Sequence, residues 1–244
     1  MSVRAFLPAH AQVELGANVE LDDEESRYLL KVRRLRPGDV VELLDGVARA
    51  WTGRLAGAGR RAEVVVEAPV VAPEPPARVV LLGLPDAPAT LEALTGASEL
   101  GATRVVLVRC ARSQGRTPPS DRVTRVLRAA QRQCGRPRPL EVVGLERPLE
   151  LRDALALDAE LPGWFAWEAL RDGEAEHAAQ DRGGPPVAEA GLRLLVGPEG
   201  GLTASEVEAI RAVGFRAVGL GPWVLRTPTA VIALLARFVS PADG

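Results

Sequence analysis

Two glycine-rich loops near the end of the chain place the strongest constraint on its fold. The first spans residues 194–203 with the sequence LLVGPEGGLT, and the second spans residues 218–227 with the sequence VGLGPWVLRT. Apolar, strand-forming residues lead into each loop, and a helix-capping residue closes each one. Because glycine has no side chain, the main chain of such a loop can approach a ligand closely and offer bare N–H and C=O groups. The pair indicates a site for a flat, nucleoside-type ligand.

The chain lacks the common nucleotide-binding motifs. It contains no G-x-x-x-x-G-K-[ST] segment, which excludes the phosphate loop of the NTPases, and no G-x-G-x-x-G segment follows a strand, which disfavours a dinucleotide fold. An ordinary turn before a helix is the alternative interpretation of the first loop taken alone. The second loop downstream disfavours that alternative.

The spacing of turns and apolar runs predicts two domains. Residues 1–70 form short alternating runs separated by turns, which is typical of a small β-barrel, with one short helix over 22–34. A stiff proline-rich linker follows over 71–76. Residues 77–244 alternate between strands and helices, which predicts an α/β domain with a mainly parallel sheet covered on both faces. The strands are expected at 78–84, 104–108, 164–167, 192–196 and 217–220, and the helices at 88–100, 120–134, 203–213 and 228–239.

Composition favours a cytoplasmic globular protein. The two cysteines, Cys110 and Cys134, cannot build a disulfide framework or a zinc site, so a reducing compartment is expected. The chain has no signal-peptide pattern and no run of eighteen apolar residues, so we expect neither export nor a membrane span. No metal site is expected. Residues 172–190 resemble a flexible excursion from the second domain.

Charge is distributed unevenly along the chain. The net charge is −2, yet residues 101–140 contain ten arginines and one acidic residue, which gives this segment a charge of +9. Such a local basic block predicts an RNA partner. Within it, Arg122, Arg125 and Arg128 recur at helical spacing along one face. A solvated arginine-rich helix is the alternative, because the chain uses 29 arginines and one lysine throughout.

Five features occur in the order found in one known family. They are Arg4-Ala5-Phe6, the segment KVRRLRPGD at 31–39, SELGA at 98–102, QCGR at 133–136, and the paired loops V-G-P-E-G-G-L-T and L-G-P-W-V-L-R-T. This pattern resembles the 16S ribosomal RNA uracil-N3 methyltransferases of the SPOUT superfamily. The resemblance implies a PUA-like RNA-binding domain, a trefoil-knot domain that holds S-adenosylmethionine, 16S rRNA as the partner, and a homodimer with its site at the subunit interface.

The resemblance also implies roles for particular residues. The predicted cofactor-binding residues are Leu195, Val196, Gly197, Glu199, Gly200, Leu220, Gly221, Leu225 and Thr227. The predicted RNA-binding residues are Arg4, Lys31, Arg34, Arg112, Arg122, Arg125, Arg128 and Arg136. Arg226 is the predicted catalytic residue, because a planar cation stabilises the charge on a uracil carbonyl once N3 loses its proton. Capping of a nearby helix is the alternative role for Arg226, and His10 and His177 are expected on the surface.

The chain departs from the family pattern near the second loop. Pro228 stands where most members have glutamate, Trp223 where most have arginine, and Tyr28 where a histidine is often found. Two other functions therefore stay open: a related methyltransferase with another RNA target, and a catalytically idle RNA-binding protein. Locally, Thr203 and Glu206 form a predicted capping box, and Thr227-Pro228 suits a helix start because proline lacks only an N–H that would be unpaired there.

Overall fold

The computed structural model describes residues 3–9, 11, 13–72, 74–168 and 191–238. His10, His177 and the predicted excursion at 172–190 lie outside the described residues. By their internal contacts the residues divide into two units: Met1–Glu74 with Arg128–Pro139, and Pro75–Leu127 with Leu140–Gly244. The contiguous boundaries predicted at 70 and 77 do not include this return of 128–139 to the first unit. Within the described ranges, no helix is long and apolar enough to cross a bilayer.

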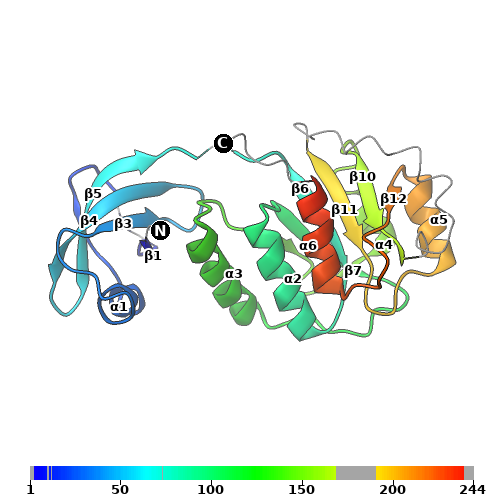
Figure 1. The fold of residues 1–244 in the computed structure, drawn as a ribbon, viewed down its shortest axis with the longest axis horizontal. Coiled ribbons are helices and arrows are strands. Elements are labelled where there is room, and N and C mark those ends of the chain that lie inside the picture. The colour runs from blue at the N-terminus through cyan, green and yellow to red at the C-terminus, as the bar shows by residue number, and fades with distance from the viewer. Residues whose placement is uncertain (1–2, 10, 12, 73, 169–190, 239–244) are drawn as a thin grey trace. The chain divides into compact units, whose positions relative to one another are not determined.

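Unit 1 is built on a mixed five-stranded sheet with the order β1-β3-β4-β5-β2 (Figure 1). Its strands are β1 (Val3–Phe6), β2 (Asn18–Glu20), β3 (Val40–Leu44), β4 (Ala50–Ala58) and β5 (Ala62–Val70). β1 and β3 are parallel, and the other pairs are antiparallel. Alternate apolar residues face a common core, as the period-two pattern of a half-buried sheet requires. The expectation of a small strand-rich N-terminal domain is confirmed.

The one short helix predicted at 22–34 is two different elements. α1 (Asp23–Arg27) begins at Asp22, whose carboxylate accepts from the Glu25 backbone N–H at 2.8 Å. The chain then widens into a π-helical turn, η1 (Tyr28–Val32). Sequence periodicity does not distinguish this turn from an α-helix, because both present apolar residues on one side over such a short span.

The last part of α3 (Ser120–Cys134) packs within unit 1. Arg132 forms an ion pair with Glu25, which is 1% exposed, and its guanidinium lies 4.5 Å from the centre of the Tyr28 ring. Burial raises the pKa of the Glu25 carboxyl, and Arg132 opposes that rise. Arg128 lies 4.3 Å from the centre of the Phe6 ring. These contacts give several arginines of the basic block an intramolecular role.

Unit 2 contains a seven-stranded sheet in which every pairing is parallel. The strand order is β12-β10-β11-β6-β7-β8, and β9 also pairs with β7. The strands are β6 (Arg78–Gly83), β7 (Arg104–Arg109), β8 (Glu141–Val143), β9 (Leu149–Glu150), β10 (Gly163–Ala166), β11 (Leu192–Val196) and β12 (Arg216–Val218). The predicted parallel sheet is confirmed, while the short strands β8 and β9 had no clear sequence signal.

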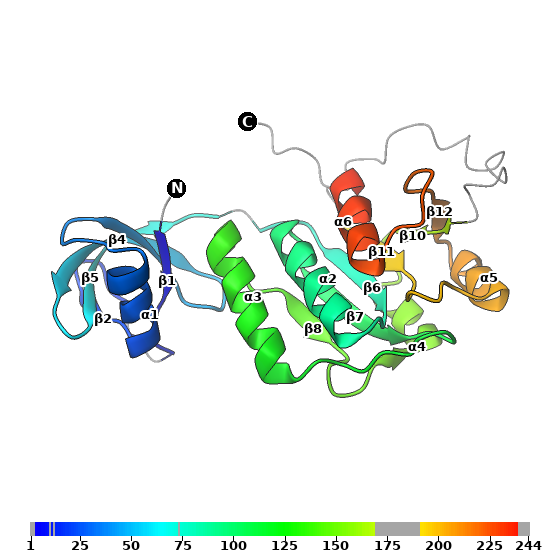
Figure 2. The same ribbon diagram turned by 60° about the horizontal axis from the view of Figure 1, so that its bottom comes forward.

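Helices cover both faces of this sheet, which explains why its central strands are apolar throughout. α2 (Ala87–Glu99) and α6 (Thr227–Phe238) lie side by side on one face, and α4 (Leu151–Ala156) and α5 (Ala204–Ala212) lie on the other (Figures 1 and 2). Successive residues alternate between the two cores: Val80 and Leu82 face α2 and α6, whereas Val79 and Leu81 face α4 and α5. Between β12 and α6 the chain therefore passes from one face to the other.

Candidate active site at the glycine-rich loops

The two glycine-rich loops border one cavity of about 360 Å³ in unit 2. Three neighbouring strands of the parallel sheet, β11, β10 and β12, end there. Because parallel strands point their carboxyl ends to the same edge, the segments that follow them gather at that edge, the usual place for ligands in such sheets. Residues 196–202, 219–221 and 223–227 line the cavity together with Ala166, Trp167, Glu168 and Ala230.

The first loop is held by the predicted capping box at the start of α5. The Glu206 carboxylate accepts from the Thr203 backbone N–H at 2.8 Å and from the Ala111 backbone N–H at 2.7 Å, and the Thr203 hydroxyl accepts from the Glu206 backbone N–H at 3.3 Å. Burial alone raises the pKa of the Glu206 carboxyl, but these N–H donors hold that pKa below its ordinary value. The loop is therefore anchored to both α5 and the segment after β7.

The second loop is fastened at both ends. The Arg237 guanidinium donates to the Gly219 carbonyl at 3.2 Å, and the Thr227 hydroxyl donates to the Gly197 carbonyl at 3.3 Å, which joins the second loop directly to the first. Gly221 has φ = +121°, and a Cβ built there meets no atom within 4 Å. Such a backbone conformation favours glycine. The space beside Gly221 is open, because no atom lies where a side chain would begin.

Pro228, one of the departures from the family pattern, lies within α6 and fits the helix without distortion. It is the second residue of α6 and is buried. An N–H at this position of a helix has no intrahelical acceptor, so proline removes no bond there.

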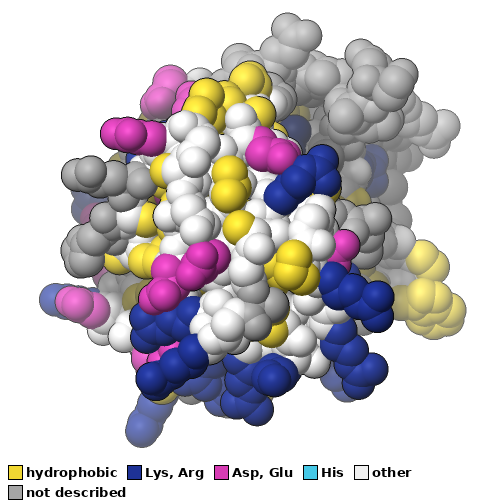
Figure 3. Space-filling model, turned by 90° about the vertical axis from the view of Figure 1, so that its left-hand side faces the viewer, with side chains coloured by type: hydrophobic (Ala, Val, Ile, Leu, Met, Phe, Trp, Pro, Cys, Tyr) yellow, Lys and Arg dark blue, Asp and Glu magenta, His cyan; other side chains and the backbone are white. Residues whose placement is uncertain are grey.

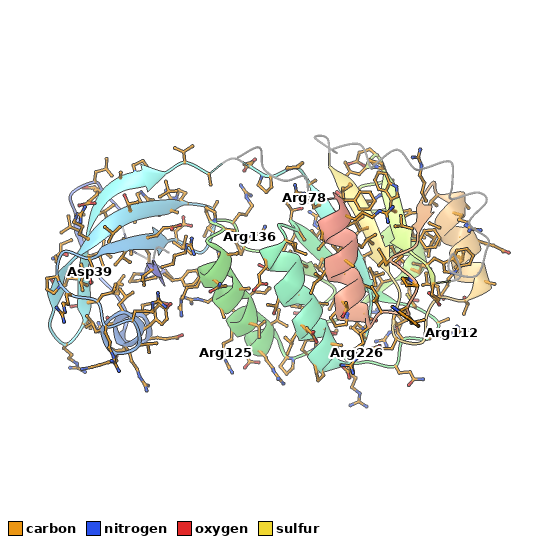
Figure 4. All side chains as sticks on the ribbon, in the orientation of Figure 1. Asp39, Arg78, Arg112, Arg125, Arg136 and Arg226 are labelled. Atoms are coloured by element: carbon orange, nitrogen blue, oxygen red, sulfur yellow. The ribbon has the colours of Figure 1, made fainter. Side chains whose placement is uncertain are left out.

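Arg226 and Arg112 lie at this edge of unit 2 (Figure 4). Arg226 is exposed and lines the cavity, and within the described part of the chain no hydrogen bond or ion pair holds its guanidinium. The structure thus gives no support to the alternative that Arg226 caps a helix. Arg112 donates to the Gly200 carbonyl at 3.0 Å, so it supports the first loop.

Eight of the nine residues predicted to bind the cofactor line the cavity: Val196, Gly197, Glu199, Gly200, Leu220, Gly221, Leu225 and Thr227. Leu195 does not, because its side chain points to the opposite face of the sheet. It is 1% exposed and packs in the core beneath α4 and α5. A contact of the Leu195 side chain with a ligand in the cavity is therefore not expected, and a contact through its backbone stays a prediction.

Sequence reasoning missed Trp167 and Glu168, which follow β10 and line the cavity. Trp167 packs near Phe165. The Arg211 guanidinium lies over the Trp167 ring, 4.6 Å from the centre of that ring. The strand ending at 167 was predicted, but its position between β11 and β12 was not. A strand's neighbours in a sheet depend on the chain path, which no local pattern shows.

A second cavity of about 560 Å³ lies beside α4 and α5. Its buried arginine is already engaged: Arg193, 2% exposed, donates to the carbonyl oxygens of Leu155, Leu157, Ala159 and Leu161. The loop-lined cavity, in contrast, is bordered by bare glycine backbone and by the Arg226 guanidinium, which has no partner among the described residues, so it is the better candidate for the active site.

Arg4, predicted to bind RNA, is committed to contacts within unit 1. Its guanidinium forms an ion pair with Glu42 at 3.0 Å and donates to the carbonyl oxygens of Arg132 and Gln133 at 3.2 and 3.0 Å. It lies so close to Gly135, which has φ = +80°, that a Cβ there would come within 2.4 Å of it. The segments Arg4-Ala5-Phe6 and QCGR therefore meet at the end of α3. Arg4 thus has a structural role within unit 1, and its contact with RNA stays a prediction.

Other arginines of the basic block are also engaged. Arg104 pairs with Glu141 and Asp158, both at 2.8 Å, and Arg128, predicted to bind RNA, lies 3.7 Å from the buried Glu25 carboxylate as well as over Phe6. Arg136 also has an interaction within the protein. Arg122 and Arg125 are exposed, and Arg125 makes only a long 3.4 Å pair with Asp121. Only part of the +9 block is thus available to RNA.

A second basic surface, which we term the basic turn, covers residues 27–36. It contains five exposed basic residues and no acidic one: Arg27, Lys31, Arg33, Arg34 and Arg36. No ion pair holds any of these side chains in the described parts of the chain. Figure 3 shows Lys and Arg side chains gathered along the lower edge of the face it presents, on the side where Figure 1 draws α1. Lys31 and Arg34, both predicted to bind RNA, belong to this surface.

Two family models match this chain, one for each unit, and together they define its class. The family model described as RNA methyltransferase domain matches residues 73–239, and the model described as RNA methyltransferase PUA domain matches residues 21–67. The chain belongs to this RNA methyltransferase family.

Particular relatives share nearly the whole chain. The ribosomal RNA small subunit methyltransferase E of Mycobacterium bovis is 34% identical over 235 residues, which cover 91% of this chain and 86% of the relative. A crystal structure of ribosomal RNA small subunit methyltransferase E from Neisseria gonorrhoeae bound to S-adenosyl methionine has a TM-score of 0.74 and 27% identity, with 97% of this chain and 96% of that chain covered. A putative methyltransferase from Legionella pneumophila, at 22% identity and a TM-score of 0.74 over 98% of this chain and 97% of that one, shares the fold.

Proposed function

We propose that the protein is an S-adenosylmethionine-dependent methyltransferase that modifies N3 of a uridine in the 16S rRNA of the small ribosomal subunit. One observation carries the proposal: both glycine-rich loops line a single cavity, and the Arg226 guanidinium stands there with no partner among the residues that the structure describes. The names of the relatives support the same class of reaction and substrate.

The residues around the cavity suit this cofactor. Val196, Leu202, Leu220 and Ala230 provide apolar walls for a flat adenine, and the glycines expose backbone N–H and C=O groups for its polar edge. Glu199 and Glu168 are the carboxylates in the lining, and they suit ribose hydroxyls and a cationic amino-acid end. When bound, the cofactor supplies an electrophilic methyl group on its sulfonium.

The remaining chemistry concerns the uracil. N3 loses its proton to solvent or to a carboxylate, and its electron pair forms the new bond to the methyl carbon as the carbon–sulfur bond breaks. The negative charge that the lost proton leaves on the uracil, before the methyl group is transferred, spreads onto the carbonyl oxygens. Arg226 is placed to donate to one of them, and a preorganised donor that faces developing charge is among the largest contributions to catalysis.

The proposed reaction is tested by mass spectrometry of 16S rRNA nucleosides from a strain that lacks this gene. We expect 3-methyluridine to disappear and to return when the gene is restored. An unchanged nucleoside profile would contradict the proposed target and favour another RNA substrate or an idle RNA-binding protein.

For RNA, we propose that the basic turn is a main phosphate-binding surface, with Arg122 and Arg125 as a further contribution. Unpaired, exposed cations release counterions when they bind phosphate, whereas arginines already paired within the protein gain less. The homodimer and the cytoplasmic location, both expected from the sequence, remain parts of this proposal, and sedimentation of the purified protein tests the first.

Replacing Arg27, Lys31 and Arg33 by alanine is expected to weaken binding to 16S rRNA. Each lost contact with a single-stranded phosphate should lower the slope of log affinity against log salt by about 0.7, so the triple variant should lose about two units of slope. Filter binding at several salt concentrations measures both quantities.

A matched control removes three positive charges elsewhere in unit 1. Arg49, Arg54 and Arg61 are each ion-paired, with Asp45, Glu67 and Glu20 respectively. Their replacement by alanine should change the salt slope little. Equal losses in the two triple variants would mean that overall charge, not the basic turn, governs binding.

A further inference from the structure

Trp223 is the most exposed large aromatic side chain among the described residues. It is 79% exposed, whereas Trp51 and Trp164 are 8% and 5% exposed, and Trp167 is half-buried beneath Arg211. A large apolar side chain in water forgoes the stabilisation of burial, about 1.5–3 kcal/mol for a residue of this kind. Exposed apolar groups that gather at a cavity commonly mark a binding surface.

Trp223 lies at the candidate active site. It lines the same cavity as Arg226, and Val224 beside it is 66% exposed. The loop that carries Trp223 is anchored at Gly219 by Arg237 and at Thr227 through the Gly197 carbonyl. The backbone is thus held while the indole projects from it, which is the arrangement of a preorganised platform rather than a loose loop.

Chemistry on a base within RNA requires that base to leave its stack, and unstacked bases are commonly received by aromatic side chains. An indole has a wide face, and the guanidinium of Arg226 nearby offers donors to a base edge or phosphate. We propose that Trp223 stacks on an unpaired base of the RNA substrate at the mouth of the cavity and so helps to select a single-stranded uridine. This proposal rests on the proposed function, because it assigns a substrate contact to that same site.

The test compares two probes, an oligouridylate and an abasic oligonucleotide of the same length, which carries the same phosphates without bases. The native protein should bind the oligouridylate more tightly, with quenching of indole fluorescence. Trp223→Ala should reduce the affinity for the oligouridylate by about five- to a hundredfold, the range expected for one base–aromatic stack. The same substitution should leave the affinity for the abasic oligonucleotide unchanged. Trp223→Phe should retain most of the preference, and Val213→Ala, an exposed apolar residue outside this cavity, should retain all of it.

Two results would overturn the proposal. One is an unchanged preference for the oligouridylate in Trp223→Ala. The other is dissociation of Trp223→Ala into smaller species in analytical ultracentrifugation, which would assign the indole to contact between two copies of the chain. If the native protein transfers no methyl group to small-subunit RNA but Trp223→Ala still loses the base preference, the stacking role stands and the proposed reaction fails.

Discussion

Replacing Arg226 by alanine is expected to slow methyl transfer by about a hundredfold or more, the scale of losing one preorganised donor to a developing oxyanion. The guanidinium lines the cavity and has no partner within the described residues, so its removal leaves no buried group unsatisfied. The fold and the affinity for S-adenosylmethionine should therefore change much less than the rate. Single-turnover transfer from labelled S-adenosylmethionine to small-subunit RNA measures the effect.

Two further variants show whether a slower rate in Arg226→Ala comes from the lost donors of Arg226 or from the loss of a positive charge in general. Arg226→Lys should recover only part of the rate, because an ammonium cannot reproduce the planar fork of donors. Arg147→Ala removes one exposed positive charge outside the cavity and should leave the rate unchanged. A normal rate in Arg226→Ala would show that the chemistry depends on another residue, and no transfer by the native protein on any ribosomal substrate would favour an idle RNA-binding protein.

Gly83→Ala is expected to weaken S-adenosylmethionine binding by about tenfold or more, although Gly83 does not line the cavity. Gly83 ends β6, and a Cβ there would lie 2.7 Å from both the ring nitrogen and Cδ of Pro198 and 3.0 Å from the Gly197 carbonyl carbon. The first loop would have to move. Overpacking of this kind costs typically about 1–3 kcal/mol, and about 1.4 kcal/mol corresponds to tenfold in affinity.

Calorimetric titration with S-adenosylmethionine tests this prediction, and thermal unfolding establishes that the variant is folded. Gly59→Ala is the matched control, because a Cβ at Gly59 meets no atom within 4 Å and its φ is not in the left-handed region. Undiminished affinity in folded Gly83→Ala would mean that the first loop tolerates displacement or does not hold the cofactor.

Local features of the sequence were sufficient to predict most helices and strands of unit 2. α3 spans Ser120–Cys134, the predicted range, and the capping box at Thr203 and Glu206 forms as expected. These signals are reliable because they arise between residues at most four positions apart. The same holds for the loops: glycines after an apolar strand limit the backbone there whatever the rest of the chain does.

The assembly of the site depended on tertiary structure. β10 lies between β11 and β12, so Trp167 and Glu168 join the two loops, while Leu195 faces the other core. Arginine commonly contacts RNA, but the Arg4 guanidinium donates to the backbone carbonyls of residues 128 and 129 positions further along the chain. The amino-acid sequence by itself determined which segments become strands, helices and glycine loops, because short-range forces decide those. Which arginines stay unpaired and which strands become neighbours was decided only by the path of the folded chain, since partners distant in sequence leave no local pattern.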